Sequence, residues 1–187
     1  MRSGATLRGI ANRFVMRDCP LVLTGFMGSG KSSVGRVLAE RLGCPFVDLD
    51  AEIVASAGRS INEIFAVDGE AAFRSMESAC LERVLAGGRS VIATGGGVVV
   101  SDVNRGRLRR QGVVINLRVS LAQVLTRLDG AADRPLFAGS NAENSVKLLM
   151  DAREQFYADA DIRIDTDGKS VEDVAAEILR FVEELHD

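Results

Sequence analysis

The stretch LTGFMGSGKSSVGRVLAERLG, residues Leu23–Gly43, runs from an apolar segment through a glycine-dense turn into an amphipathic helical pattern. Four of its residues, Gly25, Gly30, Lys31 and Ser32, occupy every specified position of the motif G-x-x-x-x-G-K-[ST]. An apolar strand before the motif and a helix after it are the context that the motif requires. The stretch therefore predicts a strand, loop and helix that bind the phosphates of a nucleoside triphosphate.

The chemistry of phosphate binding explains the residue types in this loop. Glycines let backbone N–H groups converge on phosphate oxygens, and the helix N-terminus adds the positive end of its dipole. Lys31 can reach the outer phosphates. Ser32 can offer its hydroxyl to Mg²⁺, which usually keeps several waters and needs few protein ligands. The expected ATP-binding residues of the loop are Gly28, Ser29, Gly30, Lys31, Ser32 and Ser33.

Apolar segments alternate with helical patterns along the whole chain, which predicts an α/β fold with a five-stranded parallel sheet flanked by helices. The predicted strands are Pro20–Thr24, Pro45–Asp48, Ser90–Thr94, Val113–Leu117 and Asp161–Asp165. The predicted helices are Lys31–Leu42, Asp50–Ala57, Ile61–Asp68, Gly69–Ala86, Ser101–Gln111, Ser120–Leu128, Asn141–Asp159 and Val171–Leu185.

Two segments depart from this alternation. Nearly forty residues with several helical patterns separate the second and third strands, so we expect a helical insertion over about residues 50–86. The stretch Asp129–Ser140 is polar, contains glycine and carries Arg134 before a proline, which is typical of a mobile loop. We expect a lid over about residues 129–140, a flexible extension over 1–19 and a single domain over 20–187. A targeting segment is the alternative for the arginine-rich extension.

Composition excludes several classes of protein. The 187 residues are 47% hydrophobic and 26% charged, as in soluble globular proteins, and the formal charge of −3 provides no general field for nucleic acid. The three cysteines lack CxxC spacing and only one histidine is present, which argues against a disulfide framework and a zinc site. We expect a cytoplasmic protein, monomeric, without nucleic-acid or membrane partners.

The phosphate loop alone does not decide the reaction. Signalling GTPases read guanine through N-K-x-D, and no lysine of this chain follows an asparagine. Motor and transport ATPases need longer chains or large partner surfaces. A kinase of a small molecule is favoured, because its second site fits within one compact domain.

The sequence FVDLDAEI, Phe46–Ile53, places two carboxylates at the end of the second predicted strand. Alternate residues of a strand project to the same side, and ligands of open α/β sheets lie beyond the carboxyl ends of the strands. Asp48 is suited to the magnesium shell. Asp50 could orient the attacking hydroxyl and accept its proton, with capping of the next helix as the alternative.

Two further motifs follow along the chain. Arg74 lies early in a predicted helix, where a surface ion pair with Glu77 is the alternative to a role in binding. Three glycines, Gly95, Gly96 and Gly97, follow an apolar strand, where a ligand could approach the backbone N–H groups. A simple tight turn is the alternative for the glycines.

Together these motifs resemble the shikimate kinase family in order and spacing over about Leu21–Leu185. The segments that carry the resemblance are GFMGSGKSSVGRVLAERLG, FVDLDAEI, INEIF, GEAAFR, GGGVV, DRPLF and AREQFY. The resemblance implies a fold like that of nucleoside-monophosphate kinases and ATP-dependent phosphorylation of the 3-hydroxyl of shikimate, in the route to chorismate and the aromatic amino acids.

The resemblance also assigns residues. It implies that Asp50, Arg74, Gly96 and Arg153 hold shikimate, with Gly95 and Gly97 beside them, and that both arginines bind its carboxylate. It implies that Arg134 meets ATP from the lid, and that Arg127 and the segment Asp167–Val171 lie on either side of the adenine. The expected catalytic residues are Lys31, Asp50 and Arg134, and the expected metal ligands are Ser32 and Asp48. The family often has proline where this chain has Gln155 and Val171.

Two other functions stay open at this stage. A kinase of another small acceptor, such as gluconate or a nucleoside monophosphate, would make no particular use of paired carboxylate-binding arginines. A nucleotide-binding regulatory module would not need the full set of Lys31, Ser32, Asp48, Asp50 and Arg134.

Overall fold

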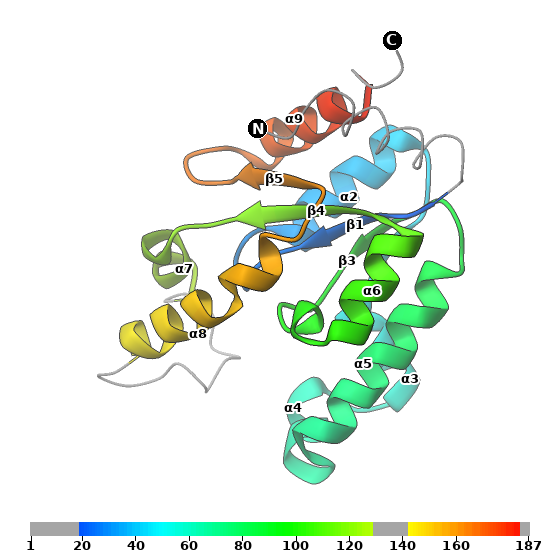
Figure 1. Ribbon diagram of the computed structural model, residues 1–187, viewed down its shortest axis with the longest axis vertical. Helices are drawn as coiled ribbons and strands as arrows, with labels where there is room; N and C mark the ends of the chain where they lie inside the picture. The colour runs from blue at the N-terminus through cyan, green and yellow to red at the C-terminus, as the bar shows by residue number, and fades with distance from the viewer. Residues whose placement is uncertain (1–18, 129–141, 184–187) are drawn as a thin grey trace.

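The computed structural model describes residues 19–128 and 142–183 as a parallel five-stranded sheet with helices on both faces (Figure 1). The strands follow one another in the spatial order β2-β3-β1-β4-β5. Their bounds are β1 Leu21–Thr24, β2 Phe46–Asp48, β3 Val91–Ala93, β4 Val113–Arg118 and β5 Ile162–Asp165. The predicted parallel sheet is confirmed.

The phosphate loop follows the central strand, β1, and therefore lies at the middle of the sheet's carboxyl edge. Leu21 pairs in register with Val91 of β3 on one side and with Val113 of β4 on the other. The carboxyl ends of parallel strands meet at one edge, where open α/β sheets bind their ligands. The connections after β1, β3 and β4 are therefore neighbours in space, although they lie far apart in the sequence.

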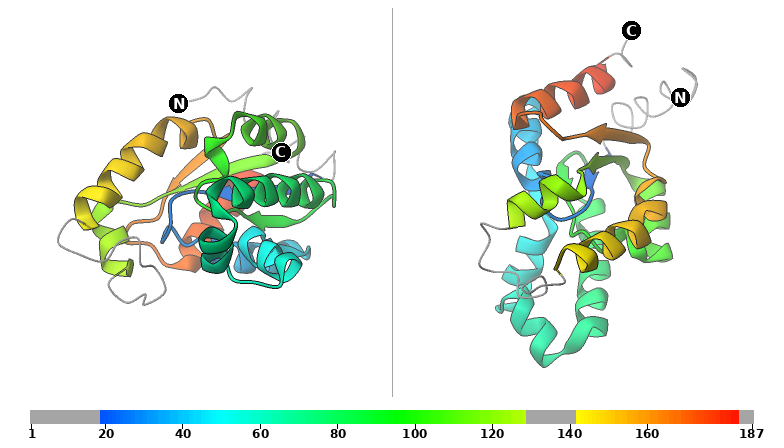
Figure 2. Two further views of the ribbon diagram at one scale, coloured as in Figure 1. Left: turned by 90° about the horizontal axis from the view of Figure 1, so that it is seen from below. Right: turned by 90° about the vertical axis from the view of Figure 1, so that its left-hand side faces the viewer.

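Alternate residues of the strands build two separate cores. Leu21 and Leu23 of β1 pack toward α2 (Lys31–Leu42) and α9 (Val171–Glu183). Val22 faces the opposite core, to which α5 (Gly69–Leu85), α6 (Asp102–Gln111) and α8 (Ala142–Tyr157) contribute. Leu21, Val22 and Leu23 are 0% exposed, so the strand is buried on both faces, as is typical of parallel sheets. Figure 2 shows the two helical layers from two further directions.

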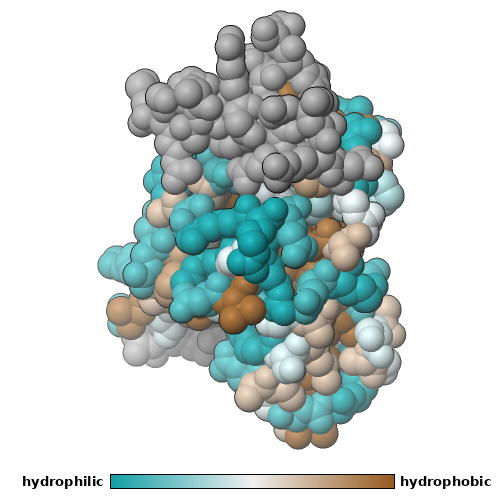
Figure 3. Space-filling view, turned by 45° about the vertical axis from the view of Figure 1, so that its right-hand side comes forward, coloured by the Kyte–Doolittle hydropathy of each residue, from teal (hydrophilic) through white to brown (hydrophobic). Residues whose placement is uncertain are grey.

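The segment between β2 and β3 forms the predicted helical insertion. It contains α3 (Leu49–Ala57), α4 (Ile61–Val67) and α5, and it extends below the sheet in Figure 1. A capping box between Ser60 and Glu63 starts α4, and the rings of Phe65 and Phe73 lie 4.7 Å apart between α4 and α5. In the space-filling view the coloured surface is mostly hydrophilic, with apolar atoms at this lower end (Figure 3). The insertion therefore has apolar packing of its own.

The boundaries differ from the predicted ones at two functional places. The helix after β2 begins at Leu49 rather than Asp50, because the side chain of Asp48 accepts hydrogen bonds from the first-turn amides and acts as the N-cap. A short 3-10 helix, η1 (Val98–Val100), follows the three glycines and was not predicted. Helix α7 spans Leu121–Leu128.

Some predictions lie outside the described residues. These are the flexible extension, apart from residue 19, and the lid, so the division of the chain at residues 19 and 20 stays a prediction. Within the described ranges, every helix is too short or too polar to span a membrane.

Candidate active site

The phosphate loop between β1 and α2 uses glycine where the backbone requires it. Gly30, the N-cap of α2, has φ 89° and ψ 13°, in the left-handed region that residues with a Cβ rarely adopt. Gly25 has φ 145°, and a Cβ placed on it would lie 2.4 Å from the carbonyl oxygen of Leu117. The loop can therefore pass under the end of β4 only with glycine at this position.

Lys31 holds its positive charge over the same loop. Its Nζ donates hydrogen bonds to the carbonyl oxygens of Gly25 and Phe26, both at 2.9 Å. Ser29, which is 1% exposed, offers its Oγ at 3.5 Å. The ammonium group of Lys31 and the amino end of α2 therefore lie close together at the same loop. This arrangement binds phosphate oxygens in loops of this type.

Asp48 connects the end of β2 with the phosphate loop. One carboxylate oxygen accepts a hydrogen bond from Ser32 Oγ at 2.7 Å. The other accepts from the backbone amides of Asp50 at 3.1 Å and Ala51 at 3.3 Å. The structure thus brings together the two predicted metal ligands, Ser32 and Asp48, and gives Asp48 the capping role that we had considered for Asp50.

Asp50 reaches the site from a helix and not from a strand. It lies in the first turn of α3, so the alternation of strand residues does not place it. Its Oδ1 is 2.8 Å from the point where a Cβ on Gly95 would be. The carboxylate nevertheless faces the glycine loop, defined here as Gly95–Gly97, and its catalytic role stays a prediction.

The glycine loop is closely surrounded by charged side chains. A Cβ on Gly97 would lie 2.4 Å and 2.7 Å from the two terminal nitrogens of Arg74. A Cβ on Gly96 would lie 3.6 Å from Nη1 of Arg153 and from the carbonyl oxygen of Gly25. The loop therefore passes between two guanidinium groups and close to the phosphate loop, and a side chain on Gly97 would displace the guanidinium of Arg74.

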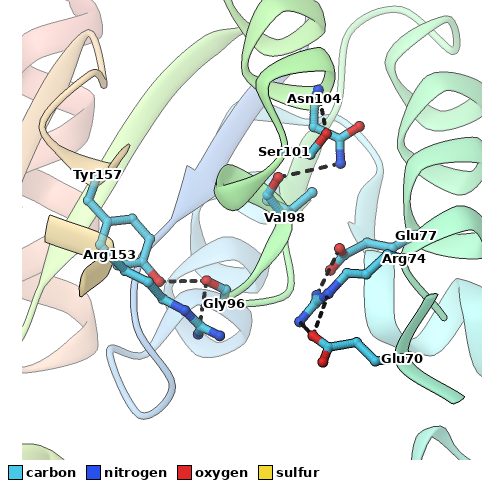
Figure 4. Close-up of polar contacts among 9 residues, drawn as sticks. All are labelled: Glu70, Arg74, Glu77, Gly96, Val98, Ser101, Asn104, Arg153 and Tyr157. Carbon is cyan, nitrogen blue, oxygen red and sulfur yellow. Dashed lines mark hydrogen bonds and ion pairs between the residues drawn. The ribbon is translucent and has the colours of Figure 1, made fainter. Parts of the chain in front are cut away.

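The two arginines approach this loop from different helices. Arg74 of α5 lies between Glu77, at 3.0 Å, and Glu70, at 3.2 Å, and its Cζ is 5.2 Å from the ring centre of Phe73. Arg153 of α8 donates to the carbonyl oxygen of Gly96 at 3.4 Å. Figure 4 shows the arginines on opposite sides of the glycine loop. The structure thus brings together Asp50, Arg74, Arg153 and the three glycines.

Arg127 connects α7 with the phosphate loop. Its guanidinium donates a hydrogen bond to the carbonyl oxygen of Gly28. Asp167, in the connection after β5, accepts from the amide of Ser120 at 3.0 Å, just before α7. The two segments that were predicted to border adenine are therefore neighbours. Arg134 lies outside the described residues.

Glu77 is a buried acid whose position the sequence analysis did not foresee. The ion pair with Arg74, which we had considered as a surface pair and as the alternative to a binding role, is present, but the glutamate is only 1% exposed. Its Oε1 has no hydrogen-bond partner among the described residues. Burial raises the pKa of Glu77, an effect that Arg74 opposes and the charge of Asp50 increases. An exposed i,i+3 pair and a buried one look alike in the sequence, so helical spacing alone could not find this residue.

The raised pKa of Glu77 predicts a pH-dependent stability. The ordinary value is 4.5, so the folded chain binds this proton more tightly than the unfolded chain does. The stabilisation by protonated Glu77 is complete below that pH and is lost as the pH rises through the raised pKa. We expect the free energy of unfolding of the unmodified protein, relative to Glu77→Gln, to decrease from pH ~4 to pH ~8. Urea unfolding at several pH values measures this difference.

A control for this experiment is Glu82→Gln on the same helix. The side chain of Glu82 is 61% exposed and forms an ion pair with Arg107. Its stability relative to the unmodified protein should vary much less with pH. A difference for Glu77→Gln that is independent of pH, or that changes in the opposite direction, would contradict the prediction.

The fold and the site together define a P-loop phosphotransferase with a second, arginine-flanked site beside the phosphate loop. More narrowly, the chain belongs to the shikimate kinase family, since a family model described as shikimate kinase matches residues 27–183. The shikimate kinase of Geobacter sulfurreducens is 54% identical over 164 residues, covering 88% of this chain and 91% of that protein. The shikimate kinase of Geobacter metallireducens is 53% identical over 163 residues, covering 87% of this chain and 91% of that protein.

Solved structures agree with this family. A shikimate kinase from Acinetobacter baumannii, in complex with shikimate, superposes with a TM-score of 0.85 at 35% identity, covering 89% of this chain and 93% of that one. A gluconokinase from Sinorhizobium meliloti has a TM-score of 0.58 at 20% identity, covering 90% of this chain and 93% of that one. This similarity shows a shared fold alone.

Proposed function

We propose that this chain transfers the terminal phosphate of ATP to the 3-hydroxyl of shikimate, giving shikimate 3-phosphate and ADP, in the route to chorismate. One structural observation supports the proposal independently of family membership. The glycine loop that separates Arg74 from Arg153 is also next to the phosphate loop, because a Cβ on Gly96 would lie 3.6 Å from the amide nitrogen of Met27. An acid bound between the arginines would therefore lie beside a bound triphosphate. We also propose that the reaction takes place in the cytoplasm.

Arg74 and Arg153 would bind the acceptor through its carboxylate. A guanidinium group offers two parallel donors that match a carboxylate, which an ammonium group cannot do. Shikimate is small and polyhydroxylated, so it offers too little apolar area to bind by burial alone. The amides of the glycine loop would complete this anion site, and the shikimate complex of the Acinetobacter baumannii relative supports this choice of acceptor.

Asp50 would orient the attacking hydroxyl. Its carboxylate lies beside Gly95, and its backbone amide bonds Asp48, which also bonds Ser32 at the phosphate loop. Asp50 would thus lie close to both the proposed acceptor site and the phosphate loop. In this position it could accept the hydroxyl proton as the oxygen attacks the terminal phosphorus. In-line transfer needs little other covalent help from the protein, because positioning and charge stabilisation supply most of the rate.

The site fits Mg²⁺ with few protein ligands. The Ser32 hydroxyl and the Asp48 carboxylate lie side by side, with 2.7 Å between their oxygens. Among the described residues no group of three or more His, Cys, Asp or Glu forms a metal cage, and magnesium in phosphate-transfer sites commonly binds one or two protein oxygens with waters and phosphates. When bound, Mg²⁺ would neutralise charge on the phosphates. Ser32 and Asp48 would hold it.

Three cationic residues would act on ATP. Lys31 would contact the outer phosphates from the amino end of α2, and Arg127 would lie against the adenine, close to Gly28. Arg134 would reach the transferred phosphate from the proposed lid. Backbone amides of Gly28–Ser33 would bind the remaining phosphate oxygens.

The proposed function is tested by measuring ADP release from ATP and Mg²⁺ with shikimate, with gluconate, with shikimate methyl ester or with no acceptor. Turnover that requires shikimate is expected. The ester should be a poor acceptor because it lacks the charge that the arginines bind. Turnover with gluconate alone would support a different small-molecule kinase, and ATP binding without turnover of any acceptor would support a regulatory module.

Arg74→Ala is expected to raise the KM for shikimate about 10- to 100-fold, the effect of losing a charge-assisted hydrogen-bond pair. The kcat should change much less, because Arg74 is proposed to bind the ground state and the transition state alike. Steady-state kinetics at saturating ATP separates the two constants.

The matched control is Arg83→Ala. Arg83 lies on the same helix, its side chain is 60% exposed, and it forms an ion pair with Glu52. It should leave the KM for shikimate unchanged. A loss of kcat at unchanged KM in Arg74→Ala would contradict the proposed binding role.

A further inference from the structure

One backbone carbonyl in the glycine loop is held by two side chains of α8. The hydroxyl of Tyr157 donates to the carbonyl oxygen of Gly96 at 2.6 Å, and Nη1 of Arg153 donates to the same oxygen at 3.4 Å. The residues are four apart, so they project from the same face of the helix. Figure 4 shows both side chains pointing at this carbonyl. The tyrosine contact is short and the arginine contact is long.

The tyrosine hydroxyl is a permanent donor. Tyr157 is 5% exposed, and burial raises the pKa of its hydroxyl to about 12, although the charge of Arg153 opposes this. The hydroxyl therefore keeps its proton throughout the neutral range. It can satisfy the carbonyl at all pH values at which the enzyme would work.

The rest of the glycine loop is held from other directions. The amide of Val98 donates to Gly95 and that of Val100 donates to Gly97, so η1 fixes the exit of the loop. The buried Asn104 of α6 donates to the carbonyl oxygen of Val98 at 3.4 Å. Within the described ranges, by contrast, the hydrogen bonds to the Gly96 carbonyl come from α8 alone. Since glycine has wide conformational freedom, this bond decides how the peptide between Gly96 and Gly97 is oriented.

We propose that Tyr157 is a positioning residue for the acceptor: its hydroxyl fixes the peptide between Gly96 and Gly97 and leaves the guanidinium of Arg153 available for the acceptor's carboxylate. This role rests on the proposed function. Gly96 is half-buried, and its carbonyl bonds are part-buried, so leaving the carbonyl without a donor has a cost. Without the hydroxyl, Arg153 is the remaining donor and is drawn toward Gly96. The N–H groups of Nη1 that turn toward Gly96 are then lost to the carboxylate, which weakens its two-point binding.

Tyr157→Phe tests the role, because it removes only the hydroxyl and keeps the buried ring. We expect the KM for shikimate to rise about five- to tenfold, as for the loss of one hydrogen bond. The kcat and the KM for ATP should stay within about twofold, because neither depends on the orientation of the acceptor's carboxylate. A purely structural role would instead lower the melting temperature without this selective change.

The matched control is Ser90→Ala. Ser90 is 5% exposed, and its hydroxyl also donates to a backbone carbonyl, that of Gly88, at the opposite end of β3 from the glycine loop. It should lose a similar amount of thermal stability and keep all three kinetic constants. Thermal unfolding of both variants shows whether each is folded at the assay temperature, and the assay is run below the lower midpoint.

A double-mutant cycle with Arg153→Ala tests the mechanism. If the hydroxyl acts by releasing Arg153, adding Tyr157→Phe to Arg153→Ala should raise the KM for shikimate further by less than about twofold. Full additivity, an unchanged KM in Tyr157→Phe, or an equal loss in kcat would overturn the positioning role. Failure of the unmodified protein to turn over shikimate in the same assay would overturn the proposed function itself, and the role with it.

Discussion

Asp50→Asn is expected to lower kcat by about 10²- to 10⁴-fold, the usual range for losing a positioned acid or base. The amide is nearly isosteric with the carboxylate, so the position beside Gly95 should be kept. It cannot accept the proton of the acceptor hydroxyl, and the KM for shikimate should change by less than the kcat. Initial rates of ADP release at saturating shikimate and ATP measure the loss.

The control for Asp50 is Asp102→Asn. Both aspartates lie in the first turn of a helix, where a negative charge interacts favourably with the helix dipole, so both variants lose this contribution to stability. Asp102 lies on α6 and pairs with Arg105. Its variant should keep a normal kcat. A kcat for Asp50→Asn within about threefold of the unmodified protein would contradict the proposed role as a base.

The sequence was most informative where function requires particular residue types at fixed spacing. The phosphate loop was predictable because the glycines, the lysine, the serine and the flanking strand and helix form one contiguous motif, although the contact that requires Gly25 comes from Leu117. The parallel sheet followed from strands that are apolar throughout and alternate with amphipathic helices. Both features were predicted from patterns that each span a short stretch of the chain.

The sequence was less informative where distant segments share one contact. The roles predicted for Asp48 and Asp50 rested on strand alternation, but Asp50 belongs to a helix that Asp48 itself caps. Similarly, the burial of Glu77 depends on what covers α5, and the bond from Tyr157 joins residues 61 positions apart. No local pattern encodes such contacts. The resemblance to a family could assign Arg74 and Arg153, but it left Glu77 and Tyr157 without a role.

The glycine loop explains why these distant residues act together. Each of its three positions would place a Cβ within 3.6 Å of a functional group: Asp50 at Gly95, Arg153 at Gly96 and Arg74 at Gly97. The loop therefore fixes the distances between the proposed base and both carboxylate-binding groups without a side chain of its own. Phosphoryl transfer depends mainly on such positioning, and a Cβ would disturb it at two positions, lying 2.8 Å from Asp50 at Gly95 and 2.4 Å from Arg74 at Gly97.

Lys31→Met is expected to lower kcat by about 10²- to 10³-fold, similar to the loss of one preorganised donor to a developing charge. Methionine keeps much of the apolar stem and removes the ammonium group that bonds the carbonyl oxygens of Gly25 and Phe26. Stability should fall by about 2 kcal/mol, at about 1 kcal/mol for each of the two hydrogen bonds that are lost. The KM for shikimate should stay nearly constant, because Lys31 is proposed to contact only the phosphates. Kinetics and urea unfolding of the same preparation measure these effects.

Lys147→Met provides the control for charge and composition, because Lys147 is 59% exposed and pairs with Asp151 on the surface of α8. It should keep normal kinetics, since an exposed ion pair contributes little. Lys31→Arg should restore the charge without restoring the rate, because the planar guanidinium is larger and cannot take the place of a compact ammonium group over the loop. Full activity in Lys31→Met would mean that the backbone amides and the amino end of α2 stabilise the transferred phosphate without this lysine.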